Sequence, residues 1–333
     1  MARLRPLAAL AKPELHLHIE GSVRWPTARE FVRAAGRAEL PETPPWAAPG
    51  WRYPDFDAFQ NVFRLYLHPA FACAAQYARI ARELAEDLAR QNVRYVELNF
   101  APGVVRCAGF PVGAAIEAML EGFAEVPRAP HLALITGYSR DKGPEDALML
   151  AQDALTHPAI AGIDLHGAGE AEWPPHLFRT VFDRARARGL LLKAHAGEFA
   201  GPESIAGALD DLGVERLGHA VALAQDPALA ERVKSRRVVL ETCPTSNVML
   251  GRVSSAAEHP LRDFLRAGHR VTVSSDDRLQ FWTDVGREYE VLRREIGCTD
   301  EEIAAVAREG FAAARAPESL RAEWIAEVDA WLV

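Results

Sequence analysis

Short apolar runs alternate along the chain with longer segments in which apolar residues recur every three or four positions. The short runs are typical of buried strands, and the longer segments of amphipathic helices. We expect strands at 14–21, 93–102, 131–140, 160–167, 190–198, 216–223, 238–247 and 270–277, and helices that include 74–91, 112–125, 175–189 and 228–235. Eight strands joined by crossover helices predict an α/β fold, a (β/α)8 TIM barrel.

The segment 39–66 interrupts this alternation between the first two predicted strands. It is rich in proline and aromatic residues, among them Trp46, Trp51 and Phe56. We expect an inserted loop and helix that covers the mouth of the barrel as a lid, with a purely structural cap as the alternative. Terminal helices are expected over 301–333. Because the barrel, the insertion and these helices account for the chain, residues 1–333 are predicted to form a single domain.

Composition restricts the class of ligand. Hydrophobic residues make up 49% of the 333 residues and charged residues 25%, which is ordinary for a globular enzyme. The formal net charge of −8 argues against a nucleic-acid groove, which needs a clustered basic surface. The same charge makes a small molecule the expected partner. No apolar run approaches the roughly 18 residues of a membrane span, so we expect no association with a membrane.

The N-terminal segment and the cysteines add little. The apolar stretch after Arg5 is soon interrupted by Lys12 and Pro13, so it does not predict a secretory signal, and we expect a cytoplasmic protein. The four cysteines lie far apart with no C-x-x-C pair, which predicts neither a disulfide framework nor a cysteine-based zinc site. These residues are Cys73, Cys107, Cys243 and Cys298.

The first predicted strand carries a polar face. Strand periodicity puts Glu14, His16, His18 and Glu20 on one side of the strand. Two imidazoles on one strand face can both reach one metal ion, although a polar strand face without a metal is the alternative when the motif is taken alone.

Three further polar motifs stand at the ends of apolar strands. His195 and Glu198 follow a run apolar enough to be buried, where a partly apolar pocket would raise the pKa of Glu198 and suit it to general acid-base work. Asp276 and Asp277 are adjacent carboxylates, whose repulsion is resolved if one binds a metal and the other a substrate. His219, after Gly218, is the weakest of these signals. The alternatives are a surface histidine with a helix-capping Glu198, a helix-capping turn at the two aspartates, and a structural His219. A parallel barrel would bring all of these groups to one mouth, which favours metal-assisted hydrolysis.

Taken together and in order, these motifs resemble those of the adenosine deaminase family of the amidohydrolase superfamily. The resemblance covers nearly the whole chain and rests on the segments 13–22, 93–102, 162–167, 195–198, 216–219, 243–247 and 275–277. It implies one zinc ion held by His16, His18, His195 and Asp276, with a water or hydroxide as the remaining ligand.

The resemblance also assigns the remaining roles in the deamination of a 6-aminopurine. It implies that His219 orients the water and that Glu198 carries its proton to purine N1. Asp277 would bind N7, and the backbone of Gly167 would meet N3. Adenosine or 2′-deoxyadenosine is the expected substrate, converted to inosine or 2′-deoxyinosine and ammonia. A 5′-modified adenosine such as aminodeoxyfutalosine and free adenine are the alternatives.

Three departures from the family pattern bear on the substrate. Members that act on adenosine usually carry Asp at the position of Glu20, where the carboxylate meets the ribose 5′-hydroxyl, and Glu is more similar to the adenine deaminase branch. The segments 164–167 and 243–247 are more similar to the adenosine branch. Arg278 stands where the family has proline, so a bulky cation is expected beside the site.

Two rival hypotheses stand beside this one. Binuclear hydrolases of the same superfamily need a bridging ligand, often a carboxylated lysine, but Lys193 is expected to face away from the site. A catalytically silent relative that binds a purine or a protein would have lost a metal ligand or the acid. Every expected ligand and Glu198 are present in the sequence.

Overall fold

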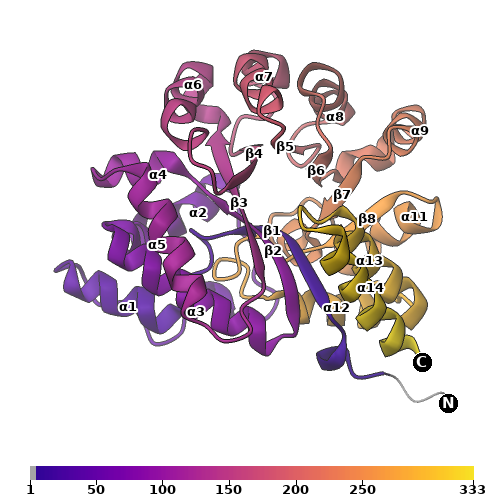
Figure 1. Ribbon diagram of the computed structural model, residues 1–333, viewed down its shortest axis with the longest axis horizontal. Coiled ribbons are helices and arrows are strands. Elements are labelled where there is room, and N and C mark those ends of the chain that lie inside the picture. Colours follow the sequence, from indigo (N-terminus) through magenta and orange to yellow (C-terminus); the bar gives the residue numbers. More distant parts are fainter. Residues whose placement is uncertain (1–4) are drawn as a thin grey trace.

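The computed structural model describes residues 5–333, and its core is a barrel of eight parallel strands (Figure 1). The strands are β1 (Lys12–His18), β2 (Val93–Phe100), β3 (His131–Ser139), β4 (Ile160–His166), β5 (Leu191–Ala196), β6 (Arg216–His219), β7 (Val239–Thr242) and β8 (Arg270–Val273). Each strand pairs with the next one in the sequence. The predicted TIM barrel is therefore confirmed.

The barrel closes between β1 and the residues that follow β8. Asp276 forms a parallel bridge with Leu17: its N–H donates to the His16 carbonyl at 3.0 Å, and its carbonyl accepts from His18 N–H at 3.3 Å. One layer below, the Ser274 hydroxyl oxygen accepts hydrogen bonds from the N–H groups of Leu15 and His16. The same contacts that close the barrel thus hold His16, His18 and Asp276 side by side.

Helices surround the barrel and connect its strands (Figure 1). They are α1 (Trp25–Ala34), α2 (Phe56–Val62), α3 (Ala74–Arg90), α4 (Pro102–Ala108), α5 (Val112–Ala124), α6 (Gly143–Ala154), α7 (Arg179–Ala187), α8 (Pro202–Gly207), α9 (Pro227–Ser235), α10 (Pro244–Met249), α11 (Leu261–Arg266), α12 (Val285–Arg294), α13 (Asp300–Ala313) and α14 (Glu318–Leu332). The predicted helices and the terminal helical pair are all present. Gly310 lets α13 lie close against β1, because a Cβ at this position would come within 3.0 Å of Pro13 Cβ.

Side chains inside the barrel include a buried ionic cluster. Lys193 Nζ lies 2.9 Å from Glu241 Oε2 and 3.3 Å from Glu97 Oε2, and it donates to the Leu15 carbonyl at 2.5 Å. The expectation that Lys193 faces away was wrong, because positions 193 and 195 share one face of β5. Lys193 lies in the layer beneath His195 and supports the site from below.

The ends of β6 and β7 come earlier than predicted. After His219 and Ala220, both at positive φ, the chain turns into a 3-10 helix over Val221–Gln225. β7 stops at Thr242, and Pro244 begins α10, because proline has a fixed φ suited to the first turn of a helix and no N–H for a sheet.

The segment 39–66 lies over the carboxyl ends of the strands. Asp55 caps α2 by accepting from Ala58 N–H at 2.7 Å. The Trp46 indole N–H donates to the Leu279 carbonyl, and the Tyr53 hydroxyl donates to the Gln280 carbonyl, both at 2.7 Å. The segment is thereby attached to the chain that follows β8. Its action as a lid stays a prediction.

Among residues 5–333, no single helix is long and apolar enough to cross a membrane. By length and composition only, α4 and α5 together could cross a membrane as a broken span. The two helices are bent by 112° at their junction.

Candidate active site and metal centre

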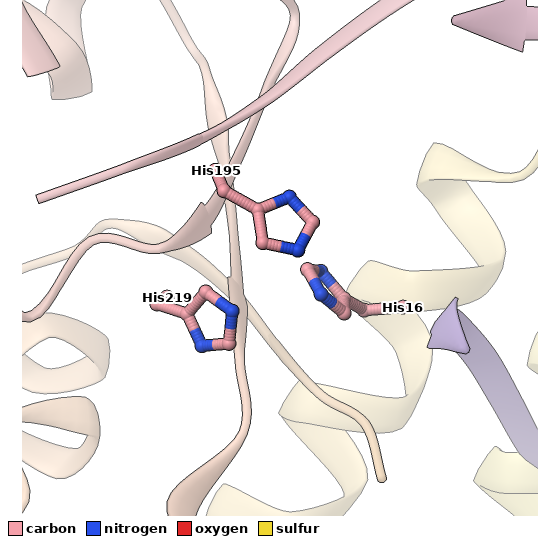
Figure 2. A group of neighbouring side chains, drawn as sticks. All are labelled: His16, His195 and His219. Carbon is pink, nitrogen blue, oxygen red and sulfur yellow. The ribbon is translucent and has the colours of Figure 1, made fainter. Parts of the chain in front are cut away.

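Five side chains predicted to lie together converge at the mouth of the barrel. The ring centroid of His16 lies 4.4 Å from that of His195 and 4.9 Å from that of His219. Figure 2 shows these three imidazoles gathered around one point. Asp276 Oδ1 lies 3.5 Å from His18 Nε2 and 3.8 Å from His16 Nε2. Four separate stretches of sequence therefore supply one compact group.

Two of these histidines are oriented by a carboxylate on Nδ1. His16 Nδ1 lies 3.2 Å from Glu241 Oε2, and His195 Nδ1 lies 3.2 Å from Asp164 Oδ1. Partners of this kind fix the ring and leave Nε2 free to bind a metal ion. The nitrogen assignments follow from these contacts.

His219 is held in a different way. Its Nδ1 lies 3.1 Å from the Asn247 side-chain nitrogen, and Asn247 Oδ1 in turn lies 3.1 Å from His259 Nε2. An amide N–H donor leaves Nδ1 as the acceptor, so His219 presents Nε2–H to the centre of the site. His219 and Asp276 both have φ of 62°, a conformation disfavoured for residues other than glycine, which is common at functional sites.

The chemistry of this group fits a divalent cation such as zinc. Burial, together with the neighbouring imidazoles, lowers the pKa of His16 and His18 well below the usual value, so both rings are neutral and able to bind a metal. His16 Nε2 is buried and has no hydrogen-bond partner among residues 5–333. A metal ion would satisfy this atom, and imidazole nitrogens with a carboxylate are ligands that zinc prefers.

Two further side chains come within ligand distance. The ligand atoms of His16, His195 and His219 lie within 4.8 Å of one another, as do those of His16, Cys243 and Asp276. Burial raises the pKa of Cys243 well above its usual value, and a protonated thiol is a poor ligand. Sequence reasoning treated Cys243 as incidental, and only its place after β7 brings it here.

Glu198 lies beside this cluster. Its Oε2 is 3.6 Å from His219 Nε2, and its side chain is 7% exposed. Burial, and then the charge of Asp276, raise the pKa of Glu198 well above the usual range. The carboxyl group can therefore carry a proton at neutral pH.

Glu170 positions the loop that carries Glu198. Its buried carboxylate accepts hydrogen bonds from four consecutive backbone N–H groups, those of Gly197, Glu198, Phe199 and Ala200, the last three at 3.2, 2.7 and 3.0 Å. Sequence reasoning missed Glu170 entirely. No local pattern could have found it, because the contact links loops 27 to 30 residues apart.

Asp277 is packed tightly against Gly21. A Cβ at position 21 would lie 2.6 Å from Asp277 Cα, so only glycine fits there. Burial, followed by the charges of Asp276 and Glu20, raises the pKa of Asp277 well above its usual value. A protonated Asp277 can donate a hydrogen bond to a ring nitrogen, which an ionised carboxylate cannot do.

The two other predicted substrate contacts lie on the same cavity. Glu20 accepts a hydrogen bond from Ala101 N–H at 2.8 Å, and burial raises its pKa to about 7. Gly167 has φ of 95°, and a Cβ there would lie 2.6 Å from Ser139 Oγ. Its backbone lines the cavity directly.

The cavity has a volume of about 450 Å³, within the usual range for a small ligand. Phe56, Phe59 and Phe63 from the segment 39–66 line it, together with Arg64 and Arg106. Phe59 stacks on Phe281 with centroids 5.0 Å apart, which ties α2 to the wall of the cavity.

Arg278 does not lie where the sequence suggested. Its guanidinium is 3.6 Å from Asp87 Oδ2, in a separate small cleft, and it does not line the cavity. The expected cation beside the site is therefore absent from the cavity wall. The neighbouring acid on α3 draws the side chain away.

A barrel with histidines and a carboxylate at the carboxyl ends of its strands defines a metal-dependent hydrolase. The sequence profile of the adenosine deaminase family matches residues 11–331, and the chain belongs to this family.

Relatives and solved structures support the same class. The chain is 35% identical to an adenine deaminase of Streptomyces coelicolor, over 98% of this chain and 96% of the relative, and 34% identical to an aminodeoxyfutalosine deaminase of the same organism, over 98% and 86%. The crystal structure of an adenine deaminase from Arthrobacter aurescens has a TM-score of 0.88 at 28% identity, with 97% of this chain and 99% of that chain covered. A zinc-bound amidohydrolase from Burkholderia ambifaria has a TM-score of 0.84 at 26% identity, with 98% and 92% covered. The family and its named relatives thus support deamination of adenine- or adenosine-type substrates.

Proposed function

We propose that the chain catalyses zinc-dependent hydrolytic deamination of a 6-aminopurine nucleoside, adenosine or 2′-deoxyadenosine, which yields inosine or 2′-deoxyinosine and ammonia. One observation carries the proposal: the neutral, buried rings of His16 and His18, together with Asp276 and a Glu198 able to carry a proton, meet at one cavity. Hydrolysis at C6 of an aromatic purine needs an activated water and an acid, and this arrangement supplies positions for both.

We propose one zinc ion per chain, with His16, His18, His195 and Asp276 as its ligands. When bound, zinc supplies Lewis acidity that lowers the pKa of water to about 7. The partners of His16 and His195 on Nδ1 support this ligand set, because they hold both rings with Nε2 turned to the centre.

The remaining side chains divide the proton work and the binding. Glu198 gives the proton that it carries to N1 and takes a proton from the attacking water, which favours addition of oxygen to C6. His219, with Nε2–H presented by Asn247, orients that water. Asp277 donates a hydrogen bond to N7, and the Gly167 N–H meets N3. The C6–N6 bond then breaks, and ammonia leaves with the remaining proton.

The size of the cavity supports a nucleoside over a bare base. Its volume of about 450 Å³ leaves space for a sugar and for a substituent on its 5′ carbon, and its lining includes the aromatic side chains of α2 and the cations Arg64 and Arg106. A 5′-modified adenosine is the second candidate for the same reason, and the 34% identical aminodeoxyfutalosine deaminase supports it.

Free adenine is the third candidate. The side chain of Glu20 lines the cavity and is one methylene longer than the aspartate of adenosine-acting members, so it takes up part of the space for a sugar. The 35% identical adenine deaminase agrees with this alternative.

A substrate panel on the zinc-loaded protein tests the proposal. Adenine, adenosine, 2′-deoxyadenosine and aminodeoxyfutalosine are followed by loss of the 6-aminopurine absorbance and by ammonia release. We expect the nucleosides to exceed adenine in kcat/KM. Glu198→Gln should keep the fold and about one zinc per chain while kcat falls at least about a hundredfold. No ammonia from any 6-aminopurine would overturn the proposal, and loss of zinc in Glu198→Gln would make Glu198 a ligand.

A further inference from the structure

A second large cavity lies at the end of the barrel opposite the active site. It has a volume of about 860 Å³, and six arginines line it: Arg216, Arg236, Arg237, Arg270, Arg315 and Arg321. Arg216 and Arg270 are the first residues of β6 and β8, and Arg236 and Arg237 come just before β7, whereas the catalytic groups stand where strands end. We call this cavity the basal cleft.

The basal cleft holds more positive than negative charge. Arg315 pairs with Glu215 at 3.2 Å, Arg236 with Asp210 at 3.0 Å and Arg270 with Glu309 at 2.5 Å. Arg216 approaches Glu97 at 3.7 Å. Arg237 and Arg321 have no carboxylate within ion-pair distance among residues 5–333. Two positive charges therefore remain uncompensated in a chain whose formal net charge is −8.

Some of the donors in the cleft lack acceptors. Arg216 is 4% exposed, and its Nη1 is buried with no hydrogen-bond partner among residues 5–333. Arg321 Nη1 donates to the Ala312 carbonyl at 3.1 Å, but its Nε is also buried without a partner. A buried donor without an acceptor is unfavourable, so these guanidinium groups gain hydrogen bonds if they donate to an anion.

We propose that the basal cleft binds a small molecule that carries a diphosphate or triphosphate group. Guanidinium groups bind phosphate oxygens in pairs of parallel hydrogen bonds, and the two uncompensated cations attract the negative charge of such a group. The volume suits a nucleotide-sized ligand. The chain's overall negative charge opposes a long nucleic acid, for which a continuous basic surface is needed.

Binding is measured by calorimetry on the full, zinc-loaded chain, with inorganic tripolyphosphate and ATP as probes. We expect one saturable site per chain for tripolyphosphate, weaker at about 200 mM than at about 50 mM salt because salt screens the charges. Arg237→Gln and Arg321→Gln should each weaken binding about fivefold or more, since each removes a charged hydrogen-bond donor. Arg237 is exposed and makes no ion pair among the described residues, so its replacement should leave the melting temperature unchanged.

Arg188→Gln is the matched control. Arg188 is an exposed arginine before β5, on the same end of the barrel, and does not line the cleft. Its replacement should change tripolyphosphate binding less than twofold. Binding of polyphosphate to the active-site zinc would be insensitive to Arg237, so this variant separates the two sites.

Three results would overturn the proposal. They are an absence of saturable tripolyphosphate binding at about 50 mM salt, binding that Arg237→Gln and Arg321→Gln leave unchanged, and an equal loss in Arg188→Gln. A single-stranded oligonucleotide that binds more tightly per phosphate than tripolyphosphate would assign the cleft to nucleic acid instead. None of these measurements depends on deaminase activity.

Discussion

Removal of the Glu170 carboxylate should impair catalysis without touching a metal ligand. Glu170 accepts hydrogen bonds from the four consecutive N–H groups of residues 197–200 and is only 4% exposed. Glu170→Ala leaves those donors without an acceptor, and the loop that carries Glu198 must find another conformation. Hydrogen bonds to charged groups contribute about 1.5–3 kcal/mol each, but the four share two oxygens and water can replace some of them. We expect a loss of about 2–4 kcal/mol in the free energy of unfolding.

The effect on turnover should be larger than the effect on substrate binding. A displacement of about 1 Å in a catalytic group can cost about a hundredfold in rate. We therefore expect kcat to fall about a hundredfold in Glu170→Ala while KM changes less than about fivefold and the zinc content stays the same. The kcat of Glu170→Gln should lie between those of the wild type and Glu170→Ala. The amide keeps one acceptor oxygen but turns an NH2 group toward the N–H donors.

A double variant tests whether Glu170 acts through Glu198. If it does, Glu170→Ala should cost little further activity in a Glu198→Gln background, because the group it positions is already lost. Glu172→Gln, an exposed position in the same loop, is the matched control and should behave as the wild type. Additive losses in the double variant, or a kcat within about threefold of wild type in Glu170→Ala, would refute the positioning role.

Three other predictions concern the cavity and the fold. Gly21→Ala should lower kcat/KM at least about tenfold in steady-state assays, because its Cβ would displace Asp277 from the substrate. Glu20→Asp should leave nucleoside kcat/KM unchanged or raised but weaken adenine about five- to a hundredfold if Glu20 fills sugar space, and equal kinetics on both substrates would exclude a contact. Burial raises the pKa of Glu288 from 4.5 to about 7, so the folded state binds its proton more readily and stability falls as pH rises between these values. In urea unfolding, the free energy of unfolding of Glu288→Gln relative to that of the wild type should rise by about 2–3 kcal/mol from pH 5 to pH 8, because only the wild type loses stability over this range.

The barrel and the proximity of most candidate site residues could be predicted because their signals are local. Alternation along β1 places His16 and His18 on one face, and short apolar runs that end in His195 and Asp276 mark the ends of strands. Parallel strands then bring these ends to one rim whatever the details of the loops. Periodicity of this kind is readable from sequence, since it reflects burial on one side of each strand.

The parts that could not be predicted depend on contacts between distant loops. Glu170 reaches residues 197–200 only because two loops of the mouth fold against each other. Arg278 follows two site carboxylates, yet Asp87 on α3 draws it into a different cleft. Strand ends were misjudged for a related reason. Positive φ at His219 and the proline at the start of α10 end the strands earlier than their apolar character suggests.

The surroundings of Lys193 favour a single metal over a binuclear centre. A bridging carboxylated lysine must first be a neutral amine that can add carbon dioxide. Burial alone would lower the pKa of Lys193, but the charges of Glu241, Glu97 and Asp164 outweigh burial and raise it, so the amine stays protonated. Its three N–H donors are taken by the Leu15 carbonyl, Glu241 and Glu97, one layer below the histidines. Lys193 therefore serves the site indirectly: it holds Glu241, and Glu241 holds His16 with Nε2 turned to the centre.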